Sequence, residues 1–503
     1  MGEVFQYYKR PDPTTWVFLS SFLSVGLFFV FHRFWSIRNL DLILLLMLGP
    51  GVLVVHRGYQ MELAAVEGTV QGPTTQPAAV PVESSSAKFS SAKFSSGESS
   101  VTESPATVIE DSREEGPVAE RVRARRIRRG GFLYLFVVEL LWVVRLVLDP
   151  MKVRRPRLSP NLTGGGLSFI GISLFLFMAA NVVNATPRSE TTQGPRLGPG
   201  YPMMNSLPAL PTRGSSSGTV DLIARRATPA IDAAANPVRP PAPTGPAIVL
   251  AKTLAIASNL VIVLAIVLIC DRHFDHFQAG VGAATLYLLL PSTAQLIGRV
   301  DHALPAAALL LAVLMYRRPM VAGVLIGLAA GLVYYPFFLL PLWLAFYWTN
   351  GARQFAVGFA AAVAALMVLL ALDDSRSMAG HLQQMFGILS PLKEASELHG
   401  YWSIGVSPIW RLPVIVGFVI LSIFVAIWPS EKNLGTLISG GAALMAAAQF
   451  WHGYGGGLYV AWFVPLALLV IVRPNLQDRV AAKVVRRDGT VRREVDAFGP
   501  AAA

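Results

Sequence analysis

The chain has 503 residues, of which 53% are apolar and only 14% are charged, against roughly 25% charged in an ordinary soluble domain. This composition excludes a typical water-soluble enzyme and indicates an integral membrane protein. The net charge of +12 fits basic cytoplasmic loops better than a nucleic-acid partner. Cys270 is the only cysteine, so disulfides within the chain and multi-thiolate metal sites are excluded.

The first part of the chain predicts a transmembrane hairpin and two segments that do not cross the membrane. Residues 1–66 contain two apolar runs and form the predicted N-terminal hairpin. Residues 67–120 are rich in Ser, Thr, Pro, Ala and Glu, and they predict a disordered linker because they cannot bury enough apolar area to offset their ordering entropy. Residues 121–158 have basic flanks around an apolar stretch, which predicts a segment on the membrane surface in contact with lipids.

The remainder of the chain predicts a helical core. Residues 159–472 form this polytopic core, an irregular outer loop over 184–246 interrupts it, and residues 473–503 form a charged cytoplasmic tail. Crossing the hydrocarbon layer takes about 20 apolar residues, and shorter runs are tolerated where they pack inside a bundle. We therefore predict an all-α, polytopic integral membrane protein with about 12 transmembrane helices.

Basic residues predict which connectors face the cytoplasm. If residues 152–157 lie inside and the uncharged run 164–183 leads outward, the later runs alternate. The short basic connectors then all lie inside, as the positive-inside rule prefers, and these connectors are 271–279, 317–318, 350–353 and 431–432. The longer connectors lie outside, and they carry most of the polar residues that could act in catalysis or binding.

Close helix packing is predicted at one place in the core. Gly323, Gly327 and Gly331 recur at every fourth position of an apolar run. Small residues at this spacing let a second helix approach closely. Packing is therefore the preferred explanation for these glycines.

Three motifs in the C-terminal half carry a family resemblance. They are Gln295-Leu-Ile-Gly-Arg-Val-Asp301-His302, a small-residue run from Val321 that ends in Tyr334-Tyr335-Pro336, and His452-Gly-Tyr454 followed by Tyr459-Val-Ala-Trp462-Phe-Val-Pro465. Together with the many-span layout, these motifs resemble the GT-C superfamily of membrane glycosyltransferases, over about residues 280–472. The branch that they resemble most is the one that uses polyprenol-phosphate-mannose donors.

The resemblance implies a GT-C-like bundle with its active site on the non-cytoplasmic face of a membrane, here a bacterial inner membrane. It implies transfer of a sugar, mannose in the most similar branch, from a polyprenyl-phosphate donor to an acceptor that the sequence does not identify. No cofactor is expected, because Walker and Rossmann signatures are missing from the sequence. No metal site is expected either, because His273 and His276 are two candidate ligands without a third.

The chemistry of transfer assigns roles to the polar residues. A base must take the proton of the acceptor hydroxyl, and cations must stabilise the departing phosphate. Asp301 is the candidate catalytic residue, as this base or as a sugar-binding acid. The candidate substrate-binding residues are Arg299, His302, Tyr334, Tyr335, His399, His452 and Tyr454.

Each candidate also has a structural explanation. Asp301 adjoins Arg299 and His302, and the three side chains can form a satisfied cluster at a helix end. Aromatic residues at span ends can anchor an interface, and residues 452–457 can form a simple turn. The alternative function is a non-catalytic membrane scaffold or a transporter of lipid-linked substrates, although a transporter is expected to show internal repeats.

Overall fold

The structure is a computed structural model that describes residues 13–70, 107–152, 160–193, 197–210, 244–373, 377–386, 398, 400–453, 455–477 and 479–485. These residues form a helical bundle with one small antiparallel sheet, made of β1 (Arg188–Thr192) and β2 (Pro208–Ala209). Within these described ranges, six helical stretches are long and apolar enough to cross a membrane, and further apolar helices have 10–17 residues. The predicted class, an all-α protein with the composition of a multi-pass membrane protein, is confirmed at this level.

Long helices dominate the first half of the chain. They are α2 (Pro13–Phe28), α3 (Ile37–Leu46), α4 (Leu48–Val70), α5 (Thr107–Val147), α6 (Gly164–Val183) and α9 (Gly245–Phe274), with the short α7 (Tyr201–Asn205) before α9. Helix α6 has the predicted bounds, and the Thr163 hydroxyl caps it by accepting from the backbone N–H of Gly166 at 3.4 Å. Both ends of the predicted linker 67–120 are helical, in α4 and α5, and residues 71–106 lie outside the described residues.

Shorter helices follow in the second half, where a proline or a short 3-10 turn divides several of the apolar runs. They are α10 (Phe277–Leu289), α11 (Pro291–Leu296), α12 (Val300–Leu314), α13 (Pro319–Leu332), α14 (Leu340–Tyr347), α15 (Ala352–Ala371), α16 (Met378–Phe386), α17 (Arg411–Ile427), α18 (Leu434–Ala447), α19 (Val464–Val472) and α20 (Ala481–Val484). Short 3-10 turns, η3 (Tyr335–Leu339) and η9 (Val460–Trp462), precede α14 and α19. Asn433 and Thr436 form a capping box that fixes the start of α18.

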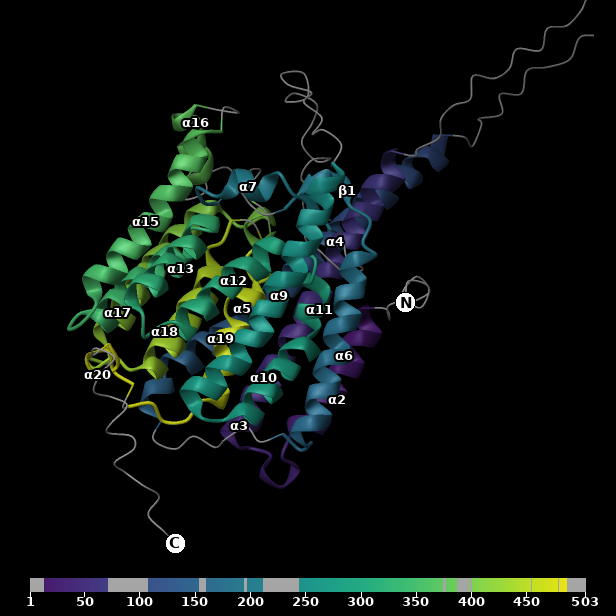
Figure 1. Cartoon of the computed structure of the whole chain (residues 1–503). Coiled ribbons are helices and arrows are strands. Elements are labelled where there is room, and N and C mark those ends of the chain that lie inside the picture. Colours follow the sequence, from purple (N-terminus) through teal and green to yellow (C-terminus); the bar gives the residue numbers. More distant parts are fainter. Residues whose placement is uncertain are drawn as a thin grey trace, which may run out of the picture.

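The helices run between two ends of the bundle, which we call the upper and lower ends as seen in Figure 1. Helices α7 and α16 and strand β1 lie at the upper end, and α3 and α20 lie at the lower end. Connectors predicted to be cytoplasmic meet at the lower end. There His273 Nε2 donates to the carbonyl oxygen of Leu314 at 2.9 Å, and the N–H of Leu434 donates to the carbonyl oxygen of Arg479 at 3.1 Å.

The predicted irregular loop 184–246 is ordered in part. It contains β1, α7 and β2, while residues 211–243 lie outside the described residues. Two backbone hydrogen bonds tie it to the end of α13, from Gly200 N–H to Gly331 O at 2.8 Å and from Tyr334 N–H to Leu197 O at 2.9 Å. This segment therefore covers the upper end of α13.

Helix α5 contains most of the segment predicted to lie on the membrane surface, 121–158. It runs the height of the bundle and packs against α4 and α18. Arg128 forms a buried ion pair with Glu62 of α4, and farther along the helix Arg145 binds both oxygens of Asp41, at 2.6 and 2.7 Å. Residues 119–147 of this helix are also long and apolar enough to cross a membrane, which differs from the predicted position on the membrane surface. Most of the second basic flank, residues 153–157, lies outside the described residues.

The close approach predicted from the glycines is confirmed, and the partner helix is α15. A Cβ atom on Gly323 would overlap the backbone oxygen of Phe355, and one on Gly358 would overlap the backbone oxygen of Met320. Gly327 faces the same helix, since a Cβ there would lie 2.7 Å from the oxygen of Phe359. The two backbones therefore touch where any side chain would force them apart.

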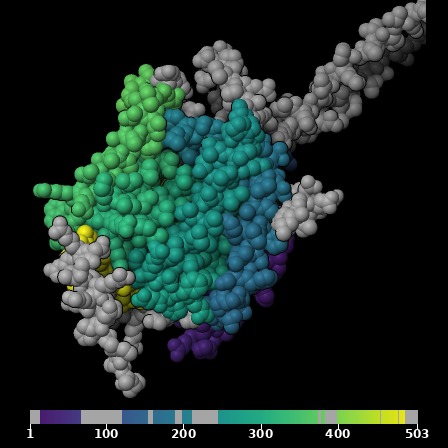
Figure 2. Space-filling model, viewed as in Figure 1, coloured from purple at the N-terminus to yellow at the C-terminus, as the bar shows by residue number. Residues whose placement is uncertain are grey.

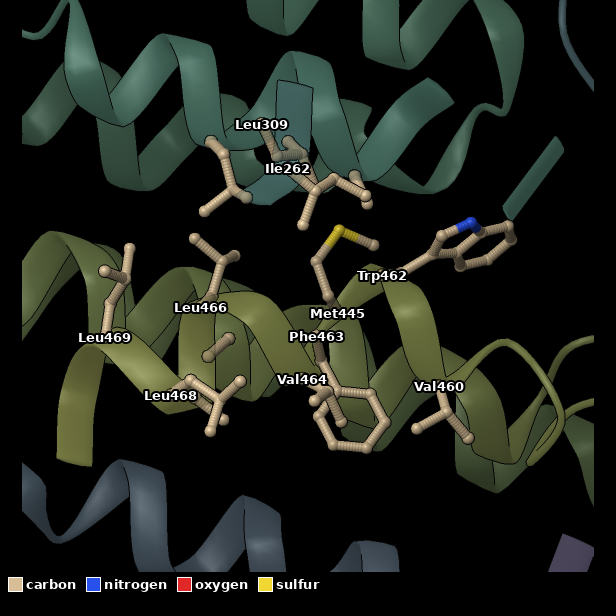
Figure 3. Packing of buried hydrophobic residues seen from close by; sticks show 14 of the residues in the cluster. Ile262, Leu309, Met445, Val460, Trp462, Phe463, Val464, Leu466, Leu468 and Leu469 are labelled. Atoms are coloured by element: carbon tan, nitrogen blue, oxygen red, sulfur yellow. The ribbon is translucent and has the colours of Figure 1, made fainter. Parts of the chain in front are cut away.

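Apolar packing fills the bundle and continues on its outside. Figure 3 shows Ile262 and Leu309, from α9 and α12, facing Leu466 of α19, and all three side chains are buried. On the outside, α6 and α9 lie next to each other in Figure 2. Phe169 and Ile172 of α6 remain 73% and 62% exposed. Large apolar side chains exposed along a 20-residue helix are expected on a surface that faces lipid.

Candidate functional site

An ion pair at the start of α12 forms the base of the candidate site. Arg299 is the N-cap residue of α12, and Asp301 lies in the first turn, where the helix dipole favours a carboxylate. The Nε and Nη2 atoms of Arg299 donate to the two carboxylate oxygens of Asp301 at 2.8 and 2.7 Å. Both side chains are buried, with exposed fractions of 5% and 1%. The pair is therefore a two-bond contact shielded from water.

A glutamine from the upper loop holds this helix start in place. Gln193, which follows β1, donates from Nε2 to the carbonyl oxygen of Gly298 at 3.0 Å. Its Oε1 accepts from the N–H of Val300 at 3.1 Å. Trp462 adds a third contact, because its Nε1 donates to the carbonyl oxygen of Asp301 at 3.2 Å. Residues more than 100 positions apart thus fix the backbone around Asp301.

Four aromatic and imidazole rings stack beside the ion pair. The ring of His302 lies 4.2 Å from that of Tyr459, which lies 4.3 Å from the ring of His452. The His452 ring then stacks on Tyr335 at 4.8 Å, with 17° between the ring planes. The stack joins α12, the 452–459 connector and η3, and one of its members, His302, places Nε2 3.7 Å from a carboxylate oxygen of Asp301.

The connector that carries two of these rings is shaped by Gln449. The Oε1 atom of Gln449 accepts from the N–H groups of Gly457 at 3.1 Å and Tyr459 at 3.3 Å. Gly456 lies against the same residue, and a Cβ atom on it would overlap the backbone oxygen of Gln449. The connector can therefore close tightly over the stack only with glycine at this position.

A second cation lies on the other side of the stack. Arg411, at the start of α17, is fully buried and donates from Nη2 to the carbonyl oxygen of Trp451 at 3.0 Å. The Trp451 ring packs on Tyr335 at 4.8 Å, and the hydroxyl of Tyr334 donates to that of Tyr335 at 3.1 Å. The charge of Arg411 also interacts electrostatically with Tyr335 and His452.

The structure brings most of the predicted site residues together at the upper end. Those that meet in one cluster are Arg299, Asp301, His302, Tyr334, Tyr335 and His452. The other two predicted residues, His399 and Tyr454, lie outside the described residues. We name the six residues that meet, together with Arg411, Tyr459 and Trp462, the upper cluster.

Two positioning residues were missed from the sequence. Gln193 stands in a polar segment without periodicity, so no local signal distinguishes it. Gln449 is a lone amide within the apolar run 434–450, and that isolation was a usable signal. A buried amide in such a run needs hydrogen-bond partners, and here the partners are in the 452–459 connector.

The upper cluster combines groups that suit transfer chemistry. It holds a carboxylate, two guanidinium groups, two imidazoles and several aromatic rings within a buried volume. A carboxylate can take a proton, the guanidinium groups can bind phosphate, and the rings can pack on a sugar. A cavity of about 10 Å³, the space of about one water molecule, reaches His302. A larger substrate therefore requires the connectors over the cluster to open.

Neither a search for metal-binding side chains nor comparison with known proteins assigns a function to the upper cluster. Within the described ranges, no group of three or more His, Cys, Asp or Glu side chains is placed to hold a metal ion. No protein-family model, curated protein or solved structure matches this chain.

Proposed function

We propose that this chain is a membrane glycosyltransferase of the GT-C type, which transfers a sugar from a polyprenyl-phosphate donor on the non-cytoplasmic face. The donor sugar is mannose in the branch that its motifs resemble most. The observation that carries this proposal is the convergence of all three motifs on the upper cluster. Side chains from residues 299–302, 334–335 and 452–462 meet there although long stretches of sequence separate them.

In this proposal each group of the upper cluster has a role. Asp301 accepts the proton of the acceptor hydroxyl as its oxygen attacks the anomeric carbon. Arg299 and Arg411 stabilise the phosphate that leaves. Arg299 occupies both oxygens of Asp301 in the structure. An entering phosphate would compete for Arg299 and thereby free the carboxylate to act as a base.

The rings of the upper cluster suit a sugar. Tyr459 and His452 present stacked aromatic faces beside Asp301, and such faces pack against the C–H groups of a pyranose. Because these rings stack on one another in the closed arrangement, the sugar would separate two of them on entry. This requirement makes the 452–459 connector the moving part of the site.

We propose that the chain crosses the inner membrane of a bacterium about twelve times. In the proposed orientation the lower end of the bundle lies in the cytoplasm. The short basic connectors meet at the lower end, which supports this orientation. The arginine run 121–129 lies at the opposite end and counts against it, although Arg125 and Arg128 are paired with Glu62. The upper cluster then faces the non-cytoplasmic side of the inner membrane.

The test is transfer in membranes that contain the full chain and are supplied with labelled polyprenyl-phosphate mannose. We expect Asp301→Asn to abolish transfer, whereas Asp271→Asn, an exposed carboxylate at the lower end, serves as the matched control and retains it. Unchanged transfer in Asp301→Asn would remove this residue from the mechanism. Absence of transfer by the wild-type chain with every polyprenyl-phosphate sugar would contradict the proposed function.

A non-catalytic scaffold is the second candidate, and one observation favours it. Asp301 already has both oxygens bound by Arg299, as in an ion pair that only stabilises a helix end. A scaffold predicts that Asp301→Asn lowers the stability of the protein without any loss of transfer, because the wild-type chain has none. The same membranes therefore distinguish the two functions.

A further inference from the structure

A cavity at the lower end is not part of the upper cluster. It has a volume of about 560 Å³, within the roughly 300–1,000 Å³ of ordinary ligand sites. It lies between the end of α9, the end of α12 and the turn before α13. Its lining residues are Arg272, His273, Leu314, Met315, Arg317 and Arg318. We call it the lower cavity.

The lower cavity is strongly basic. Arg272, Arg317 and Arg318 are exposed at its wall, and none of them takes part in an ion pair with another described residue. Arg479 contributes a further positive charge to this region. Like Arg317 and Arg272, it interacts electrostatically with His273. The nearest acids along the chain, Asp271 and Asp275, are exposed at the surface and are not among the lining residues.

A buried polar atom without a partner is found in the same place. His273 is only 5% exposed, its Nε2 donates to the carbonyl oxygen of Leu314 at 2.9 Å, and its ring packs edge-on against Tyr316. Its Nδ1 atom has no hydrogen-bond partner among the described residues. Buried polar atoms are nearly always paired. Because Nε2 carries the proton, Nδ1 of the neutral ring is an acceptor, and it is placed to accept a hydrogen bond from a water molecule or from a hydroxyl group of a ligand in the cavity.

We propose that the lower cavity binds a phosphate-bearing anion, supplied as a phospholipid headgroup or as soluble phosphate. Guanidinium groups match the oxygens of a phosphate in pairs, and three of them surround a space of ligand size. The cavity opens at the ends of apolar helices, where headgroups lie, and basic pockets between membrane helices bind anionic lipids. This site lies at the opposite end from the upper cluster, so it does not depend on sugar transfer.

The experiment uses the full chain in detergent micelles and two probes. One probe is phosphatidylglycerol, with phosphatidylcholine as its zwitterionic comparison, titrated by native mass spectrometry. The other is radiolabelled inorganic phosphate, measured by equilibrium dialysis. The variants are Arg317→Gln and Arg318→Gln, and Arg353→Gln is the matched control because it is also an exposed arginine of a lower-end connector but does not line the cavity.

We expect one of the two probes to bind the wild-type chain and to bind each cavity variant about tenfold more weakly, which corresponds to about 1.4 kcal/mol. Arg353→Gln is expected to bind as the wild type does. Preference for phosphatidylglycerol identifies a lipid headgroup, and binding of inorganic phosphate with the same dependence on the variants identifies a soluble source. Failure of both probes to bind, or equal weakening in Arg353→Gln, would overturn the proposal. Unchanged unfolding temperatures of the variants exclude misfolding as the cause.

Discussion

The ion pair between Arg299 and Asp301 allows the structural and chemical roles of Asp301 to be separated. Both side chains are buried, and two hydrogen bonds of 2.8 and 2.7 Å join them. Asp301→Asn removes the charge that balances Arg299, and breaking a buried pair in this way costs about 3–5 kcal/mol. The double variant Arg299→Met with Asp301→Leu leaves neither charge behind, so its free energy of unfolding is expected to return to within about 2 kcal/mol of the wild type.

Thermal unfolding of the purified chain and transfer of labelled sugar in membranes are the two assays. Asp301→Asn is expected to lose stability and transfer together, and the double variant is expected to recover stability without transfer. A single variant as stable as the wild type would refute the reasoning that the pair is buried and mutually dependent. Recovery of both properties in the double variant would show that Asp301 acts only in holding the structure.

Three further predictions concern the rest of the molecule. Gly323→Ala would place a Cβ against the backbone oxygen of Phe355, and the strain is expected to lower the free energy of unfolding by about 1–3 kcal/mol. The control Gly417→Ala, whose Cβ would have nothing within 4 Å, should leave the stability of the protein unchanged. Equal effects of the two variants would contradict the contact of α13 with α15. Burial lowers the pKa of Lys432 to about 8. Above that pH the unfolded chain binds more protons than the folded chain, so the free energy of unfolding should rise from about pH 8 to 10. An identical rise in Lys432→Met would refute Lys432 as its cause. A reporter fused after Arg353 should remain cytoplasmic, and its export would reverse the proposed orientation.

The helices were predictable because their signal is local. The run 164–183 carries no charge, and this composition alone predicted the bounds of α6, while the structure adds the cap by Thr163. The apolar run 280–297 was counted as one span, but Pro291 divides it into α10 and α11. Local patterns thus locate the helices, although they do not determine how the helices pair.

What the sequence did not reveal depends on distant contacts. The basic flanks of residues 121–158 suggested a segment on the membrane surface, but Arg145 of this segment is bound by Asp41 and Asp149 inside the bundle. The meeting of the three motifs was expected from the family resemblance, and the alternation of spans had placed their polar residues on the same outer face. The bonds of Gln193 to the start of α12 had no local signal, because they join residues more than 100 positions apart.

The most direct test of the proposed active site is a cryo-electron microscopy map of the full chain in a nanodisc with a non-transferable polyprenyl-phosphonate mannose. The expected map shows the phosphonate in contact with Arg299 or Arg411 and the sugar against Tyr459 or His452, with the 452–459 connector displaced. A map in which the donor analogue binds elsewhere, while the rings remain stacked and Arg299 stays on Asp301, would contradict the account.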